Sequence, residues 1–95
     1  MPRVVAAQTW KLSIPGCASL KEKRSVVRSL KDRLQARYRL SVAETGEQDT
    51  LTRAELSVAL VATDRRFAET VLDKVDRMVH DGGKTLVLDT FRDFH

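Results

Sequence analysis

The sequence has few of the residues that most often build disulfides, metal centres and covalent catalytic sites. It contains one cysteine and two histidines among 95 residues. A single cysteine, Cys17, excludes an internal disulfide, and no pattern places His80 or His95 beside it as an activating base. No cluster of histidine and cysteine has the spacing of a metal site. We therefore expect Cys17 to be inert and either buried or lining a loop, and we expect no metal and no cofactor.

Glycine-rich phosphate loops are also missing. The chain has four glycines, and neither the G-x-x-x-x-G-K-[ST] nor the G-x-G-x-x-G pattern occurs. Three acids, Glu44, Glu47 and Asp49, lie in or beside one polar loop, where carboxylates can bind a hard cation or perform acid–base chemistry. Acids in such turns are usually solvated. We identify no catalytic residue, and we expect a protein that is not an enzyme.

Long hydrophobic runs are absent too. No apolar stretch approaches the roughly 20 residues that span a bilayer, and the first residues contain none of signal-peptide length. A hydrophobic share of 42% and a charged share of 32% are typical of a soluble globular chain. These features predict one domain over residues 1–95, located in the cytoplasm and without a membrane partner.

What the sequence does contain is a regular succession of strand and helix patterns. Residues 3–14, 40–44 and 53–63 read as strands, and a last strand covers 86–88 and extends toward 94. Helical spacing of apolar residues separates the first strand from the second and the third from the fourth. The order is β-α-β-β-α-β. It predicts an α+β, ferredoxin-like fold, with an antiparallel four-stranded sheet and two helices on one face. The other face is left without a helical cover.

Both helices carry start signals and an apolar stripe. Ser19 and Glu22 match a capping box, in which the hydroxyl accepts from a first-turn amide and the carboxylate reaches back to the Ser19 N–H. Asp64 is the N-cap candidate of the second helix, and Gly82 with Gly83 ends it. The first helix is expected to bury Leu20, Val27, Leu30, Leu34 and Tyr38, with Val26 at the edge of this stripe. The second is expected to bury Phe67, Ala68, Val71, Leu72, Val75, Met78 and Val79.

Aromatic residues make up 5% of the chain, which limits one mode of RNA binding. RNA-recognition domains of this topology stack bases on aromatic residues of the two central strands. Here the first strand offers Trp10, and the strand over 53–63 has no aromatic residue. Trp10 shares a face with Leu12 and Ile14, so we expect it in the core. A base-stacking platform on the sheet is therefore not expected.

The net charge of +4 is concentrated in one segment. Residues 20–40 contain eight cations and two acids, a net charge of +6, whereas the rest of the chain carries −2. At helical spacing, one polar stripe beside the apolar stripe consists of Lys21, Arg24, Arg28 and Lys31. A basic helix can bind phosphates through charge and counterion release. These four cations are therefore the candidate nucleic-acid-binding residues.

The alternative is an ordinary solvated helix whose long cationic stems cover the edges of the core. Asp32 can pair with Arg28, and Glu22 is occupied by the cap, so few acids neutralise the stripe. Arg33 and Arg37 lie on the other flank of the helix.

The segment SLKEKRSVVRSLKDRL at 19–34, with IPG just before it, resembles the YlxP-like family of small bacterial proteins of unknown function. The resemblance continues in the same order through SVAE at 41–44, QD at 48–49, RAEL at 53–56 and VLDKV at 71–75. It implies a ferredoxin-like fold. Family members are often encoded near transcription-elongation, translation-initiation and ribosome-maturation factors, which implies a role around RNA or the ribosome. The resemblance supplies no catalytic residue.

This chain departs from the family pattern at one position. It has QDTLTRA where the family commonly has QDLWQRA, so Leu51 stands in the place of a tryptophan. A partner contact made by that tryptophan would be changed here, whereas local packing could be met by leucine.

We expect a non-enzymatic accessory protein that binds RNA or a ribonucleoprotein through the basic first helix. The alternative is a protein-interaction module that self-associates as a homodimer through the uncovered sheet face or an edge strand. These two readings are compatible, since dimerisation doubles the basic surface and raises avidity. A third reading is a small ligand or cation in the loop 44–49. No small-molecule ligand is identified by a motif.

Overall fold

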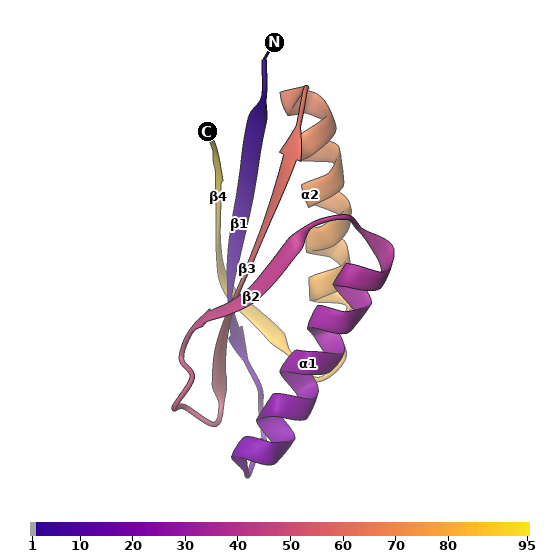
Figure 1. Cartoon of the computed structure of the whole chain (residues 1–95). Helices are drawn as coiled ribbons and strands as arrows, with labels where there is room; N and C mark the ends of the chain where they lie inside the picture. The colour runs from indigo at the N-terminus through magenta and orange to yellow at the C-terminus, as the bar shows by residue number, and fades with distance from the viewer. Residues whose placement is uncertain (1) are drawn as a thin grey trace.

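The computed structural model describes residues 2–95 and confirms the predicted order of elements (Figure 1). The elements are β1 Val4–Ser13, α1 Leu20–Arg37, β2 Ser41–Gly46, β3 Arg53–Ala62, α2 Arg65–His80 and β4 Leu86–Phe94. The strand order in the sheet is β2-β3-β1-β4, and every neighbouring pair is antiparallel. Both helices lie on one side of the sheet (Figure 1). This is the expected α+β, ferredoxin-like arrangement.

β1 is a central strand and pairs on both sides. It pairs with β3 from Val4 opposite Ala62 to Ser13 opposite Arg53, and with β4 along most of its length. Because alternate residues of a strand point to opposite faces, one set of β1 side chains lies under the helices. Trp10 belongs to this set and is fully buried. Its predicted place in the core is confirmed.

The core lies between this sheet face and the inner stripes of the two helices. Its members from the strands and the first loop are Ala6, Trp10, Leu12, Ile14, Cys17, Ala54, Leu56, Val58, Leu60 and Ala62. Its members from the helices are Val27, Leu30, Leu34, Ala68, Leu72, Val75 and Val79. The strand members alternate in sequence and the helix members recur every three or four residues, as the two periodicities require. The buried position of Cys17 agrees with the prediction.

Two residues predicted to lie in the core are exposed instead. Phe67 is 59% exposed and Leu20 is 41% exposed. Phe67 precedes buried Ala68 and is about 100° from it around the helix, so its side chain lies at the flank of α2 and not against the sheet. Leu20 shares the direction of Val27 but is the first residue of α1, where the layer of helices ends. Helical spacing predicts the direction of a side chain around the helix axis, but it does not predict which parts of the helix the sheet covers.

The predicted caps form, with one difference. The Ser19 hydroxyl accepts from the Glu22 amide at 3.1 Å, and the Asp64 carboxylate accepts from the Arg66 amide at 3.2 Å. The Glu22 carboxylate accepts from the Ala18 amide at 3.2 Å rather than from the Ser19 amide predicted by the capping box. The carboxylate reaches one residue further back and still satisfies a free amide at the helix entrance.

The end of α2 also agrees with its sequence signal. Asp81 caps the helix, and the Gly82 amide donates to the Val79 carbonyl at 3.1 Å. Gly83 then adopts a φ of 81°, a left-handed conformation that glycine takes without steric cost. The two glycines therefore end the helix as predicted.

A hydrogen-bonded polar cluster fixes α2 over the sheet. The Trp10 indole N–H donates to Asp76 Oδ1 at 2.8 Å, and Gln8 Nε2 donates to the same oxygen at 3.3 Å. Arg92 of β4 donates to Gln8 Oε1 at 2.7 Å and to Asp73 Oδ1 at 2.8 Å. Buried polar groups are normally paired in this way, because an unpaired one costs free energy. The cluster links β1, β4 and α2 through their side chains and so holds the helix at one position over the two strands.

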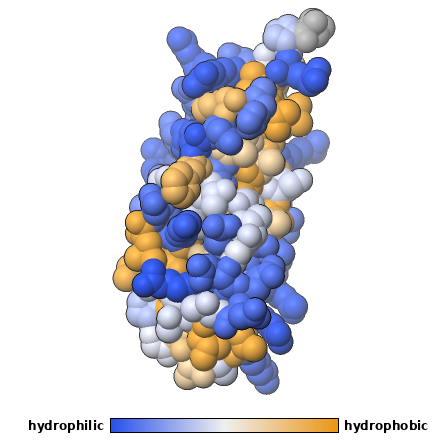
Figure 2. Space-filling model, turned by 90° about the vertical axis from the view of Figure 1, so that its left-hand side faces the viewer, coloured by the Kyte–Doolittle hydropathy of each residue, from blue (hydrophilic) through white to orange (hydrophobic). Residues whose placement is uncertain are grey.

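The sheet face opposite the helices is uncovered. Figure 2 shows this face, on which hydrophobic atoms form separate patches among hydrophilic ones. Hydrogen bonds between hydroxyl groups cross it, from Thr9 to Ser57 at 2.7 Å and from Ser57 to Thr45 at 2.8 Å. Its most exposed large apolar side chain is Val61, at 72%. The mixed polarity of the face explains how it can remain in contact with water.

Leu34 provides a direct test of the predicted core. Its side chain is fully buried in α1, so Leu34→Ala should lower the free energy of unfolding by about 2–5 kcal/mol through lost burial and a residual cavity. Urea denaturation of both variants measures this, with the exposed neighbour Gln35→Ala as a matched control, expected within about 0.5 kcal/mol of the wild type. Equal stability of the two variants would contradict the assignment.

Candidate nucleic-acid interface

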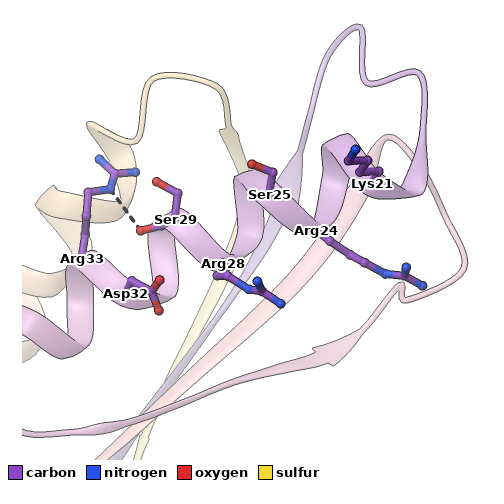
Figure 3. Close-up of a pocket in the computed structure, with 7 residues that line it drawn as sticks. All are labelled: Lys21, Arg24, Ser25, Arg28, Ser29, Asp32 and Arg33. Atoms are coloured by element: carbon purple, nitrogen blue, oxygen red, sulfur yellow. Dashed lines mark hydrogen bonds between the residues drawn. The ribbon is translucent and has the colours of Figure 1, made fainter.

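The four candidate cations lie along one side of α1. Lys21, Arg24 and Arg28 are exposed, and Lys31 is half-buried. Figure 3 shows the first three projecting from the outer surface of the helix, with Ser25 and Ser29 beside them. The regular spacing of three and four residues produces this alignment, because it returns each side chain to nearly the same direction.

Two shallow grooves border these cations. The outer groove is lined by Lys21, Arg24, Ser25, Arg28, Ser29, Asp32 and Arg33 (Figure 3). The inner groove, between α1 and β2, is lined by Arg24, Val27, Arg28, Lys31, Asp32, Gln35 and Glu44. Arg24 and Arg28 line both grooves. Together with Lys21 and Lys31 they form a ridge of cations along α1. The structure therefore brings all four candidate cations to one surface.

This surface has little neutralising charge. Within residues 2–95, no carboxylate lies within 4 Å of a nitrogen of Lys21, Arg24, Arg28 or Lys31. The ion pair predicted between Arg28 and Asp32 is not formed. A cation placed four residues before an acid is the less favourable order on a helix, which weakens the pairing. The positive charge of the ridge is left for a partner or for solvent.

The sequence reasoning missed the role of Lys23. Its side chain is 3% exposed, its ammonium lies 3.5 Å from Glu44 Oε2, and it donates to the Glu47 carbonyl. A signal for this was present, because Lys23 lies four residues before Val27 and seven before Leu30, in the apolar stripe itself. One of the eight cations of segment 20–40 therefore serves the fold and not the surface.

The same contact is relevant to the hypothesis that loop 44–49 binds a cation. Glu44 faces the Lys23 ammonium, and Glu47 adopts a φ of 61° and presents its carbonyl to it. Across the part of the chain that the structure describes, no group of three histidine, cysteine or acidic side chains is placed to hold a metal ion. The Lys23 ammonium is the cationic partner of Glu44 in this structure.

The residues suited to nucleophilic chemistry are dispersed. The buried Cys17 thiol donates to the Ser19 carbonyl at 3.5 Å. The imidazole of His80 lies 3.5 Å from Asp76, and that of His95 lies 3.2 Å from Asp93. These contacts are local ones within α2 and at the end of β4. Among the described residues, no helix is long and apolar enough to cross a membrane.

A comparison with protein families identifies the group to which this sequence belongs. A family described as "Protein of unknown function (DUF503)" matches residues 5–92, a range that includes both helices and the core of all four strands. The chain belongs to the DUF503 family. A relative in Bacillus subtilis (strain 168), the uncharacterized protein YlxP, is 39% identical over 57 residues. The alignment spans 60% of this chain and 62% of YlxP, which is less than two thirds of the relative. The predicted membership of a YlxP-like family is confirmed.

A comparison with solved structures matches this chain to a de novo designed protein and to an oxygenase. The de novo designed protein Foldit4 has a TM-score of 0.57 and 10% identity, over 98% of this DUF503 chain and 96% of Foldit4. A variant of SnoaB, a cofactor-independent oxygenase from Streptomyces nogalater, has a TM-score of 0.49 and 13% identity, over 100% of this chain and 92% of the oxygenase. At these identities the Foldit4 likeness shows the fold alone, and no activity follows from either protein.

The Lys23–Glu44 pair can be tested with a double-mutant cycle. Lys23→Met and Glu44→Gln should each destabilise the fold by about 1–3 kcal/mol, because each leaves a buried partner poorly paired. The double variant should lose less than the sum of the two, with a coupling energy of about 0.5–3 kcal/mol. Urea denaturation of the four proteins measures the coupling.

The exposed pair Arg65–Glu69, at 65% and 46% side-chain exposure, is the matched control. Its coupling should stay at about 0–1 kcal/mol because solvent screens it. A Lys23–Glu44 coupling no larger than that of the control would contradict the structural role of Lys23.

Proposed function

We propose that this protein binds RNA, free or within a ribonucleoprotein, through the outer surface of α1, and that it acts there without catalysis. The observation that carries the proposal is the ridge of cations formed by Lys21, Arg24, Arg28 and Lys31, which have no carboxylate partner within residues 2–95. Within the described chain these four cations make no ion pair that holds the fold together. Lys23, the one cation in the apolar stripe, does so by pairing with Glu44.

The chemistry of the ridge suits phosphate groups. Guanidinium groups such as those of Arg24 and Arg28 donate in a fork that matches phosphate oxygens. The hydroxyl groups of Ser25 and Ser29, in the same groove, can donate further hydrogen bonds to a sugar–phosphate backbone. Each lysine or arginine that neutralises a phosphate releases counterions, which supplies affinity without reading a sequence.

The surface offers little for reading bases. No aromatic side chain lines either groove of α1, so bases have no ring to stack on there. We therefore infer a binding mode that follows the phosphate backbone and depends little on sequence. RNA is chosen among polyanions because of the resemblance to the YlxP-like family. The genomic neighbourhood of the family members' genes implies a role around the ribosome. Such a role agrees with the expected cytoplasmic location.

Neutralising the ridge tests this function. For a single-stranded RNA, Arg24→Gln with Arg28→Gln should make the slope of log affinity against log salt shallower by about 1.4, since each lost phosphate contact removes about 0.7. Fluorescence anisotropy of labelled poly-uridine across a salt series measures the slope.

The control is Lys11→Gln with Arg53→Gln, two exposed cations that the strand register places on the uncovered sheet face. It makes the same change in net charge and should leave the slope nearly unchanged. Equal losses in the two variants, or tight binding by the wild type that ignores salt, would overturn the proposal.

Self-association is a second candidate, and a specific observation on β4 favours it. This strand is an edge of the sheet, and three of the six exposed large apolar side chains of the described residues lie on it: Leu86, Leu88 and Phe91. An edge strand presents unpaired backbone groups that can pair with another chain. Two β4 strands paired antiparallel about a two-fold axis would form an isologous interface. A dimer of this kind would keep the α1 ridges free.

Lysine substitutions on the edge strand test the second candidate. If β4 mediates a dimer, Leu86→Lys with Phe91→Lys should shift the mass measured by light scattering from dimer to monomer, because charge on an edge opposes pairing. Phe67→Lys, at an exposed apolar residue of α2, is the control and should leave the mass unchanged. Ala59→Asp, in the middle of the uncovered face, distinguishes that face from the edge. A wild-type protein that is monomeric at high concentration would remove the candidate.

A further inference from the structure

A second cationic surface lies between the two helices, apart from the ridge that the sequence identified. In Figure 1 the C-terminal end of α1 lies beside the C-terminal half of α2. Between them is an open cleft of about 500 Å³, lined by Arg33, Arg37 and Tyr38 on one side and by Lys74, Arg77, half-buried Met78 and Asp81 on the other. The two sets are some forty residues apart in the chain, and only the packing of the helices brings them together.

The cleft carries more positive charge than its surroundings neutralise. Four cations and one acid line it, and among the described residues none of these cations has a carboxylate within 4 Å. Arg33 Nε donates to the Ser29 carbonyl of its own helix, at 3.4 Å. These four exposed cations outnumber the single acid, Asp81, so the cleft has a positive potential that attracts anions.

The helix dipoles account for part of this arrangement and not for all of it. Arg37 and Arg77 lie in the last turns of α1 and α2, where a cation interacts favourably with the partial negative charge of the helix end. This effect falls off within the last turn. Arg33 and Lys74 lie further from the ends, so their presence in the cleft has no such explanation.

The cleft is continuous with the basic ridge. Arg33 lines both the cleft and the outer groove that contains Lys21, Arg24 and Arg28 (Figure 3). The path from Lys21 to Arg37 follows α1 for sixteen residues, or about 24 Å at 1.5 Å per residue. It begins in the outer groove, passes Arg33 and ends between the two helices. A chain of regularly spaced negative charges matches such a path better than a single small anion does.

We propose that the cleft between α1 and α2 binds the phosphodiester backbone of the same RNA strand that lies along the α1 ridge. This inference rests on the proposed function and extends it with a second anchor, supplied by Lys74 and Arg77 of α2 together with Arg33 and Arg37 of α1. Half-buried Tyr38 adds an aromatic ring at the cleft, the feature that the ridge lacks. Bases can stack on such a ring without sequence preference.

The same cations could in principle face an anionic membrane, but the surface favours a strand. Proteins that lie on membranes insert apolar side chains beside their cations. None of the six exposed large apolar side chains of the described residues lines the cleft or the outer groove. The four cations of the cleft are exposed on two helices with an open cleft between them, a shape that a flexible strand can follow more closely than a lipid surface can.

The test compares three double variants in the poly-uridine assay. Lys74→Gln with Arg77→Gln removes the α2 side of the cleft, Arg24→Gln with Arg28→Gln removes the ridge, and Lys11→Gln with Arg53→Gln is the charge-matched control. The cleft variant should make the salt slope shallower by about 1.4, as the ridge variant does, and combining the two should make it shallower by about 2.8. The control should match the wild type.

A positional measurement accompanies the affinities. Titration of nitrogen-labelled protein with poly-uridine should shift the amide resonances of residues 33–38 and 74–78, which a merely structural role of these cations would not do. Urea midpoints of all variants confirm that each is folded.

The outcomes separate the inference from the function on which it rests. A cleft variant with the full wild-type slope, beside a weakened ridge variant, would overturn the cleft and leave the proposed function standing. A wild-type protein that binds no RNA would overturn both. Binding to phosphatidylserine vesicles instead of poly-uridine, with loss in the cleft variant, would assign the cleft to a membrane and overturn the inference.

Discussion

The burial of Trp10 beneath α2 is the constraint on which the rest of the structure depends. A fully buried indole requires an acceptor for its N–H, and Asp76 of α2 supplies one at 2.8 Å. Gln8 donates to the same carboxylate and accepts from Arg92, so the contact also includes β4. The position of α2 along β1 is thereby fixed. β1 also pairs with β3 and β4 on its two sides, so a contact that positions α2 over β1 positions it over the neighbouring strands as well.

The charges that the fold uses are separated from those that it leaves free. Lys23 is buried against Glu44, and Arg92 is paired with Asp73, so each of these cations holds elements together. The cations of the α1 ridge and of the cleft hold nothing together in the described chain, and they gather on the helical side of the molecule. The apolar side chains of β4 lie at the edge of the sheet and its uncovered face. The two proposed partners, RNA and a second copy of the chain, therefore correspond to different surfaces of the molecule.

The sequence contains residues that specify the fold and residues that belong to the surface, and the likeness to Foldit4 helps to distinguish the two. Foldit4 shares the fold at 10% identity, so the architecture depends on the pattern of apolar residues, caps and turns more than on particular side chains. Lys23 of α1 is part of that pattern, whereas Lys21, Arg24, Arg28 and Lys31 are not. Their arrangement belongs to the surface, and it is there that a function specific to this chain has to be sought.

The sequence by itself determined the order of the elements, both N-caps, the end of α2 and most of the core, because these depend on neighbours within a few residues. It also determined the ridge of Lys21, Arg24, Arg28 and Lys31, which is a property of one helix. Only the tertiary structure decided that Phe67 is exposed, that Lys23 is buried, and that Arg33 meets Lys74 across a cleft. Local periodicity gives the direction of a side chain around its helix. What that direction faces depends on the packing of segments that lie far apart in the chain.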